Sequence, residues 1–282
     1  MTVSPCGSAL NIGDRPIFKD KIAVITGAGS GLGRQLAIDF ARRGSKVVLA
    51  DFNEAGLNET VAQLNLPAAQ VSWMKTDVTS QEDCARLIEH TLQTFGSVDF
   101  LVLSAGMSMW ARFEQLPDLS VFRRLMDVNF MGALHCIHPA LKALKTSSGM
   151  IVAISSLQGA LGVNDHTGYS ASKHALNGFL EALSYEVGEQ IHILTVMPGW
   201  IQGTNLRQNA FKANGTPEGK ARKHSKESVT VVECSDAIFR AMEGRKRDIF
   251  VPPKLRYLTW LNAVAPGIVK RLVSRAMKDQ KH

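Results

Sequence analysis

The sequence has few of the features that mark secreted or membrane-spanning proteins. Its 282 residues include only four cysteines, Cys6, Cys84, Cys136 and Cys234, without the close spacing of a disulfide framework or a zinc site. No apolar run approaches the roughly 18 residues that cross a bilayer, and the N-terminal residues lack the basic and apolar regions of a secretory signal. We therefore expect a protein of a reducing, cytoplasmic compartment that holds no metal.

Negative charge is also scarce, but only near the C-terminus. The whole chain has 32 Lys and Arg against 25 Asp and Glu, a net charge of +7. Residues 244–282 hold ten Lys or Arg against Asp248 and Asp279, so this segment carries +8 and the rest is close to neutral. Positive charge confined to a tail, without interleaved aromatic residues or a known binding motif, does not predict a nucleic-acid partner.

What the sequence does contain is an alternation of short apolar runs with amphipathic segments. The apolar runs are Lys21–Thr26, Lys46–Ala50, Val71–Thr76, Val98–Leu103, Met150–Ser155, His192–Met197 and Asp248–Val251. Continuous apolar character is typical of parallel strands buried on both faces, and Leu32–Arg43, Gln81–Phe95 and Tyr169–Val187 have helical spacing. The alternation predicts an α/β fold, a Rossmann-like three-layer sandwich with a mostly parallel seven-stranded sheet, as one domain over residues 1–282.

The first apolar run leads into a glycine-rich turn, Thr26-Gly27-Ala28-Gly29-Ser30-Gly31-Leu32-Gly33, followed by a helical segment. Glycines here let the backbone approach a pyrophosphate, and the helix N-terminus offers free N–H groups to the anion. Glycines also make ordinary turns, but a position between the first strand and a helix favours dinucleotide binding. Asp77 and Ser104-Ala105-Gly106 follow the third and fourth runs, at strand ends where ligands of open sheets bind.

An acidic residue ends the second run and bears on the choice of cofactor. Asp51 lies where a carboxylate accepts hydrogen bonds from an adenosine ribose diol and repels a 2′-phosphate, which favours NAD over NADP. Arg34 is a nearby cation that could instead receive such a phosphate. We expect NAD, with Arg34 as an exposed helix residue.

The chemically reactive pair is Tyr169 and Lys173, which share one face of a helix at i and i+4. The ordinary tyrosine pKa of about 10 suits proton transfer near neutrality poorly, and a cation one turn away is expected to lower it. Ser156, at the end of the fifth run, could hydrogen-bond the same substrate oxygen. Tyrosine and lysine at this spacing also occur on ordinary exposed helices, so the pair alone indicates little.

Taken together, the glycine turn, Asn129, Ser156, Tyr169-x-x-x-Lys173 and Pro198-Gly199 resemble the short-chain dehydrogenase/reductase family over about residues 19–255. The resemblance implies that Tyr169 is the general acid/base, that Lys173 binds the nicotinamide ribose and lowers the Tyr169 pKa, and that Ser156 polarises the carbonyl. It implies a water held by Asn129 in a proton relay. The cofactor contacts it implies are Gly27, Ser30, Gly31, Leu32, Gly33, Asp51, Asp77, Val78, Ala105, Gly106, Tyr169, Lys173, Pro198, Gly199 and Thr204.

Two positions depart from the family pattern. Ser104 replaces the asparagine that usually follows the fourth strand, which bears on local packing more than on activity. Gly203 occupies the usual place of a threonine that contacts the carboxamide, so we assign that contact to Thr204.

More narrowly, Tyr169–Gly178 (YSASKHALNG), PGWIQGTNLRQNAF and Ala265-Pro266-Gly267 resemble dehydrogenase/reductase members related to 11β-hydroxysteroid dehydrogenases. This implies a hydrophobic, steroid- or lipid-like alcohol or ketone, with Ser156, Tyr169 and Trp200 as substrate contacts. Many such relatives prefer NADP and carry Arg where this chain has Asp51. The alternatives are an NADPH-dependent 3-oxoacyl thioester reductase and a non-catalytic dinucleotide-sensing protein.

Two segments lie outside the alternating pattern. The polar stretch 205–228 is interpreted as a lid over the substrate. Residues 255–282 form a basic extension with helical apolar spacing interrupted by Pro266-Gly267. This extension could pack or contact a second subunit of a homodimer or homotetramer, close the substrate pocket, or lie on an anionic membrane surface.

Overall fold

A computed structural model describes residues 17–206, 208–212, 216, 219 and 228–278. The main strands are β1 Ile22–Thr26, β2 Lys46–Asp51, β3 Val71–Lys75, β4 Phe100–Leu103, β5 Met150–Ile154, β6 His192–Pro198 and β9 Asp248–Val251. The α-helices are α1 Gly31–Arg42, α2 Glu54–Leu64, α3 Gln81–Phe95, α4 Ser120–Met126, α5 Gly132–Ser147, α6 Thr167–Val187, α7 Val231–Glu243, α8 Leu255–Val264 and α9 Pro266–Lys278. Shorter elements are β7 Ile201–Gln202, β8 Val229–Thr230 and the single turns η1 Phe113–Gln115, η2 Asp127–Met131, η3 Leu157–Gly159 and η4 Gly188–Gln190.

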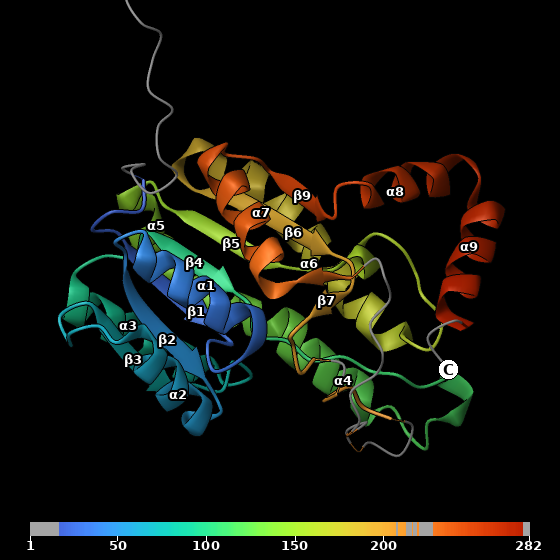
Figure 1. The fold of residues 1–282 in the computed structure, drawn as a ribbon, viewed down its shortest axis with the longest axis horizontal. Helices are drawn as coiled ribbons and strands as arrows, with labels where there is room; N and C mark the ends of the chain where they lie inside the picture. The colour runs from blue at the N-terminus through green and yellow to red at the C-terminus, as the bar shows by residue number, and fades with distance from the viewer. Residues whose placement is uncertain (1–16, 207, 213–215, 217–218, 220–227, 279–282) are drawn as a thin grey trace, which may run out of the picture.

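The main strands form one seven-stranded sheet in the order β3-β2-β1-β4-β5-β6-β9 (Figure 1). Every neighbouring pair in it is parallel. The predicted fold class is therefore confirmed, and each of the apolar runs became a strand of this sheet. The strand order reverses direction between β1 and β4, which places a crevice for a ligand at the carboxyl ends of these strands.

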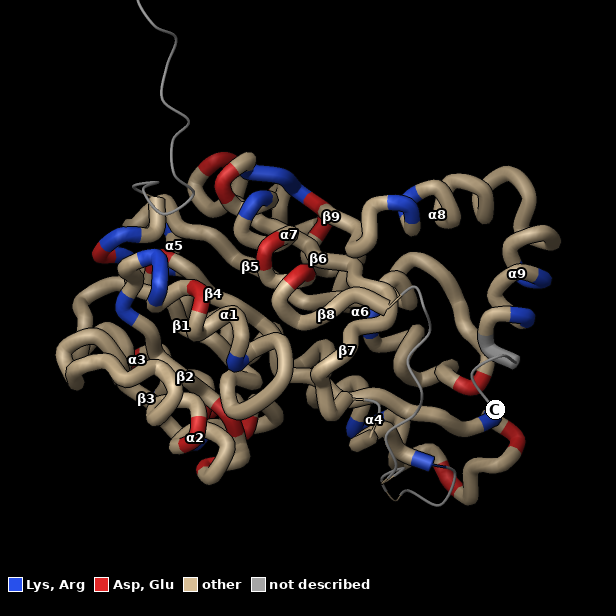
Figure 2. The backbone as a smooth tube through the Cα atoms, in the orientation of Figure 1, with Lys and Arg blue, Asp and Glu red and all other residues tan. Residues whose placement is uncertain are grey.

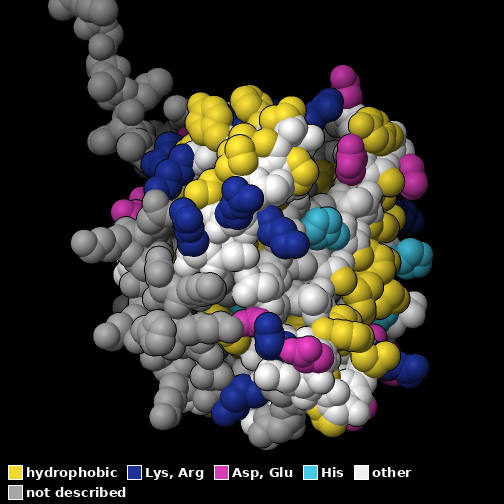
Figure 3. Space-filling model, turned by 90° about the vertical axis from the view of Figure 1, so that its right-hand side faces the viewer, with side chains coloured by type: hydrophobic (Ala, Val, Ile, Leu, Met, Phe, Trp, Pro, Cys, Tyr) yellow, Lys and Arg dark blue, Asp and Glu magenta, His cyan; other side chains and the backbone are white. Residues whose placement is uncertain are grey.

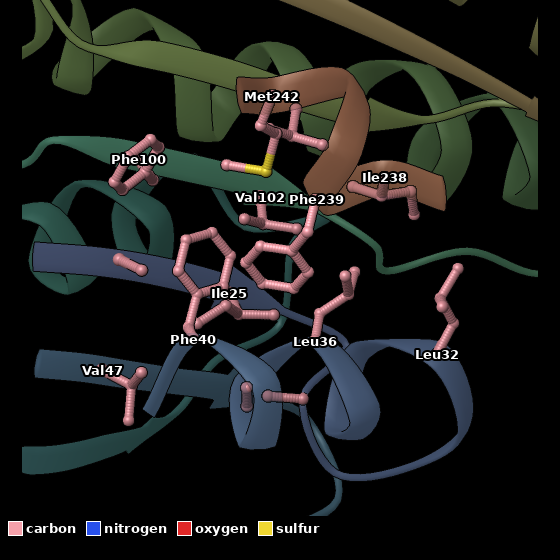
Figure 4. Packing of buried hydrophobic residues seen from close by; sticks show 14 of the residues in the cluster. Ile25, Leu32, Leu36, Phe40, Val47, Phe100, Val102, Ile238, Phe239 and Met242 are labelled. Carbon is pink, nitrogen blue, oxygen red and sulfur yellow. The ribbon is translucent and has the colours of Figure 1, made fainter. Parts of the chain in front are cut away.

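Helices cover both faces of the sheet and bury its apolar side chains in two separate layers. Side chains of α1, α2 and α7 pack on one face, and those of α3, α5 and α6 pack on the other. Four phenylalanines contribute to the first layer: Phe40 and Phe239 meet with ring centroids 4.8 Å apart, and both contact Phe18. Figure 4 shows Phe40 and Phe239 side by side over Ile25 and Leu36. These layers fix the strand ends that carry the site.

The basic extension forms two helices, α8 and α9, which we call the C-terminal arm and which project from the body beyond β9 (Figure 1). Pro266 occupies the first position of α9, where its missing N–H costs no helical hydrogen bond. Val269 of α9 is buried, and Val273 packs against the cluster formed by Trp110 and Ala210. In the described part of the chain, no helix is long and apolar enough to span a membrane. Most of the interpreted lid, 205–228, lies outside the described residues.

Candidate active site

A cleft of about 820 Å³ opens at the carboxyl ends of the strands. It is lined by all the residues expected to contact the cofactor, which are Gly27, Ser30, Gly31, Leu32, Gly33, Asp51, Asp77, Val78, Ala105, Gly106, Tyr169, Lys173, Pro198, Gly199 and Thr204. Ser156 and Trp200 line it too, whereas Asn129 lies behind it. The structure thus brings the sequence-selected residues to one place.

Two glycines of the turn, Gly27 and Gly33, are packed so tightly against the backbone that no side chain fits there. A Cβ at Gly33 would lie 2.1 Å from the Gly27 carbonyl oxygen, and one at Gly27 would lie 2.8 Å from the Ala105 nitrogen. Helix α1 begins beyond the turn with an N-cap, Ser30, whose side chain makes no capping hydrogen bond, and its first turn contains no acidic residue. The helix N–H groups therefore remain available to an anion, which fits the pyrophosphate of a dinucleotide.

Asp51 lies at the carboxyl end of β2, where its carboxylate is held in place by the glycine turn. Its oxygens accept hydrogen bonds from the backbone N–H groups of Gly29 and Asn53, both at 2.9 Å. A carboxylate offers about four lone-pair sites, so acceptor capacity remains for a ribose diol. The fit to an adenosine ribose is therefore good.

Arg34, the cation that could have received a 2′-phosphate, is engaged elsewhere. Its guanidinium makes an ion pair with Glu59 at 2.8 Å and hydrogen-bonds the Thr60 hydroxyl at 3.0 Å and the Gly29 carbonyl. Arg34 does not line the cleft, and the described cations that do are Arg124 and Lys173. The expectation that Arg34 is an exposed helix residue was nevertheless wrong, because its side chain is only 20% exposed and fastens α1 to α2.

The Tyr169 and Lys173 side chains lie inside the protein, one turn apart on α6. Both are almost fully buried, and the Lys173 ammonium lies 5.9 Å from the centre of the Tyr169 ring. Lys173 donates a hydrogen bond of 2.9 Å to the Ile154 carbonyl at the end of β5. Ser156 follows β5, and its side chain hydrogen-bonds Tyr169.

Burial controls the titration of this pair. Removal from water raises the pKa of Tyr169 to about 12, with the Ser156 hydrogen bond opposing the shift. Burial also lowers the pKa of Lys173 from 10.5 to about 8. The direction for Tyr169 is opposite to the expected one, because loss of hydration disfavours the phenolate and Lys173 is not among the causes of the shift. Tyr169 is therefore a protonated phenol at neutral pH, the form that can donate a proton.

Asn129 occupies the π-helical turn η2, which joins α4 to α5. Its side-chain amide exchanges hydrogen bonds of 2.9 Å with the backbone N–H and C=O of Met107 and donates another to the Ser172 hydroxyl. Beside Asn129 and Lys173 is a small space of about 10 Å³, close to the minimum that accommodates one water. The side chain thus has a positioning role that the sequence did not indicate, next to a space that suits the expected relay water.

The two departures from the family pattern leave the cleft intact. The loop at Ser104 is held by the Thr26 hydroxyl, which accepts hydrogen bonds from the Ser104 and Ala105 N–H groups at 3.1 and 3.2 Å. Thr204 lines the cleft opposite the glycine turn, because a Cβ at Gly31 would lie 3.4 Å from the Thr204 side chain.

The end of the cleft that contains Trp200, where the substrate is expected, has an aromatic wall; we call it the substrate end. Trp200 and Trp110 lie with ring centroids 6.4 Å apart, and His166 packs edge-on to Trp110 at 4.7 Å. Phe211 lines the same end and is held by backbone hydrogen bonds to Ser108 and Trp110. Trp200 could be predicted from the sequence, whereas Trp110 and Phe211 could not, because no local motif brings together segments a hundred residues apart.

Helix α5 contains two histidines three residues apart, His135 and His138. The His135 ring contacts the Val78 carbonyl at 3.0 Å. Over the described residues there is no group of three or more His, Cys, Asp or Glu side chains that could hold a metal ion.

Comparison with known proteins agrees with this geometry. A model of the short chain dehydrogenase family matches residues 21–215. The 11-beta-hydroxysteroid dehydrogenase A of Arachis hypogaea is 33% identical over 89% of this chain and 73% of its own length. A dehydrogenase/reductase SDR family protein 7-like of Dictyostelium discoideum is 31% identical over 92% of this chain and 82% of its own. The chain therefore belongs to the short-chain dehydrogenase family, among relatives of the 11β-hydroxysteroid dehydrogenases, as its motifs predicted.

Solved structures show the same fold. A short chain dehydrogenase/reductase from Burkholderia phymatum in complex with NAD superposes with a TM-score of 0.78 at 25% identity, covering 89% of this chain and 95% of that one. An alcohol dehydrogenase from Thermococcus sibiricus complexed with 5-hydroxy-NADP has a TM-score of 0.69 at 22% identity, covering 82% of this chain and 95% of that one. The family is one of oxidoreductases that act on CH–OH groups with a nicotinamide dinucleotide. The first of these two structures holds NAD and the second holds 5-hydroxy-NADP.

Proposed function

We propose that this protein is an NAD(H)-dependent oxidoreductase that interconverts an alcohol and a ketone on a hydrophobic, steroid- or lipid-like substrate. The observation that carries the proposal is the hydrogen-bonded pair of Tyr169 and Ser156, buried beside Lys173 between the glycine turn and an aromatic wall. A protein that only sensed a dinucleotide would need no such proton-transfer group. The apolar lining of the substrate end favours a hydrophobic substrate.

The residues divide the chemistry between them. The chemistry that a bound nicotinamide dinucleotide would supply is hydride exchange with the substrate carbon. Tyr169 donates its phenolic proton to the ketone oxygen, or accepts it back in the oxidation, while Ser156 holds that oxygen by a second hydrogen bond. Lys173 orients the nicotinamide ribose and, as a cation, supports the phenolate when the proton has left. Asn129 fixes the loop at Met107 and carries the proton path through a water toward solvent.

Tyr169→Phe tests the catalytic assignment. The variant keeps the ring that packs in the core but has no proton to transfer, so turnover should fall by about 10²-fold or more. NADH affinity should change little. Retained turnover would remove Tyr169 from the mechanism, and a wild-type protein that binds NADH but turns over no ketone or alcohol would favour the sensing role.

Cofactor choice is tested by titration with NADH and NADPH, followed by energy transfer from the tryptophans to the reduced nicotinamide. Asp51 at the ribose and the engagement of Arg34 by Glu59 support tighter binding of NADH. Asp51→Ala should reduce the ratio of NADH affinity to NADPH affinity, because it removes the charge that repels a 2′-phosphate. Arg34→Gln should leave this ratio unchanged. A wild-type preference for NADPH would overturn the NAD assignment.

We also infer that the outer face of the C-terminal arm contacts an anionic membrane surface. Exposed Tyr257, Trp260 and Ile268 lie on it, and none of the residues of α8 or α9 is acidic. Figure 3 shows hydrophobic side chains gathered on this side of the molecule with Lys and Arg beside them. An amphipathic, basic helix pair with exposed aromatic residues suits the interface of a bilayer.

Vesicle co-sedimentation distinguishes this surface from a subunit interface. Binding to vesicles containing phosphatidylglycerol, weaker on pure phosphatidylcholine, lost in Trp260→Ser and reduced by salt, is the expected result. If light scattering shows a homodimer or homotetramer that Trp260→Ser dissociates, while vesicle binding is absent, the arm is an oligomer contact instead.

A further inference from the structure

Arg124 is a charged residue of the cleft that the catalytic scheme does not use. It lies on α4, exposed to solvent, and lines the cleft together with Trp110, Trp200 and Phe211. Its guanidinium stands over the Phe211 ring, 4.7 Å from the ring centre. Within the described residues no carboxylate pairs with it, unlike Arg34, which is bound to Glu59.

The position of Arg124 is fixed by its support. Phe211 donates a backbone hydrogen bond to the Ser108 carbonyl at 3.0 Å and accepts one from Trp110 at 2.8 Å. The Phe211 ring also packs against the apolar cluster that contains Tyr169. A cation stacked on an anchored aromatic ring is preorganised, so the guanidinium is held at the substrate end without an anion to hold it.

The charges around the cleft are unevenly distributed. Asp51 and Asp77 line the end assigned to adenosine, and Lys173 lies at the catalytic centre. The remaining acid, Asp127, is on the turn after α4 and lies one helical turn nearer Asn129 than Arg124 does. The aromatic end therefore combines an apolar wall with one cation at its open side.

We propose that Arg124 binds an acidic group of the substrate, so that the enzyme prefers hydrophobic ketones or alcohols that carry a carboxylate away from the reacting carbon. The apolar body lies along Trp110 and Trp200, and the carboxylate stays at the solvent-exposed guanidinium. The fork of Arg N–H donors matches a carboxylate, and an exposed pair avoids most of the desolvation that opposes buried ion pairs. This substrate class rests on the alcohol–ketone activity proposed above.

Arg123→Gln provides a matched control for Arg124→Gln, because Arg123 is an exposed neighbour on α4 that does not line the cleft. Binding is measured first, with two fluorescent probes of similar shape: anionic 8-anilinonaphthalene-1-sulfonate and uncharged N-phenyl-1-naphthylamine. Arg124→Gln should weaken the anionic probe about tenfold relative to the uncharged one, as expected for a charged hydrogen bond. Arg123→Gln should leave the ratio of the two probe affinities at its wild-type value, and Arg124→Lys should retain part of the preference for the anionic probe.

Turnover is measured next, on medium-chain oxo acids and their methyl esters with the keto group at varied distance from the carboxylate. The ratio of KM for ester to KM for acid should be about ten in the wild type and fall to about one in Arg124→Gln. Turnover with equal KM values, or a ratio unchanged in Arg124→Gln, would overturn the anion site while leaving the proposed function standing. If Arg124→Gln weakens the anionic probe selectively but no oxo compound is turned over, the anion site is supported and the proposed function is refuted.

Discussion

The burial of Lys173 leads to a prediction about stability that is independent of catalysis. Its ammonium is held in the core beside Tyr169, and burial lowers its pKa from 10.5 to about 8. Below pH 8 the lysine is charged in both the folded and unfolded states, and holding that charge in the core costs about 3 kcal/mol at 1.36 kcal/mol per pH unit. Replacement by methionine, of similar volume, removes this cost.

Lys173→Met should therefore be more stable than the wild type at pH 7. The lost hydrogen bond to the Ile154 carbonyl offsets about 1 kcal/mol, which leaves a gain of about 2 kcal/mol in the free energy of unfolding. Between pH 8 and 10.5 the native lysine is already neutral while the unfolded one still binds its proton, so raising the pH stabilises the wild type and not the variant. The advantage of the variant should fall by about 3 kcal/mol across that window and reverse, so that the wild type is the more stable protein by about 1 kcal/mol at pH 10.5.

Urea unfolding at a series of pH values from 7 to 10.5 measures this difference directly. Other groups titrate in both proteins and cancel in the comparison, and Lys142→Met, at an exposed position of α5, controls for the lysine-to-methionine change itself. A difference that stays constant within about 0.5 kcal/mol across the window would show that burial of Lys173 is not what sets its titration. A Lys173→Met variant that is less stable than the wild type at pH 7 would lead to the same conclusion.

Four further substitutions test the fold around the site. Gly33→Ala should lose NADH binding and at least about 3 kcal/mol of stability, because its Cβ would meet the Gly27 carbonyl. Gly178→Ala is the control: a Cβ there meets open space in α6, so the variant should gain about 0.5–1 kcal/mol in thermal unfolding. Phe239→Ala should lower the urea midpoint by an amount equivalent to about 3–5 kcal/mol, because its ring is fully buried. Thr26→Val should lower the free energy of unfolding by about 2–4 kcal/mol and weaken NADH binding, because two N–H groups after β4 lose their acceptor. Unchanged stability in Phe239→Ala or Thr26→Val would contradict the packing described.

The sheet could be predicted because its strands are buried on both faces and are therefore apolar throughout. The run Lys46–Ala50, for example, corresponds to β2, whose four central residues are all buried. Helix α2 did not stand out in the same way, since only Gly56, Leu57 and Thr60 are buried among its eleven residues. A helix with so narrow a buried stripe has little apolar periodicity to detect.

The site divides along similar lines. The cofactor end is built from local motifs, in which a strand leads into a glycine turn or a single carboxylate, so spacing along the chain could locate it. The substrate end joins segments that are distant in sequence, such as Met109 bridged to Phe211. The pKa of Tyr169 also depended on tertiary packing, because helical spacing to Lys173 says nothing of how much water reaches the phenol.

The C-terminal arm links the outer surface to the cleft. Val269 and Val273 share the inner face of α9, where the first is buried and the second packs on the cluster of Trp110. Lys270 and Arg271, which directly follow Val269 in the helix, are exposed. One helix thus presents a basic face outward and an apolar face to the wall of the substrate end, so a partner that shifts α9 should also change the shape of the cleft. Substrate KM, rather than NADH affinity, is therefore the quantity that should respond when the arm is bound.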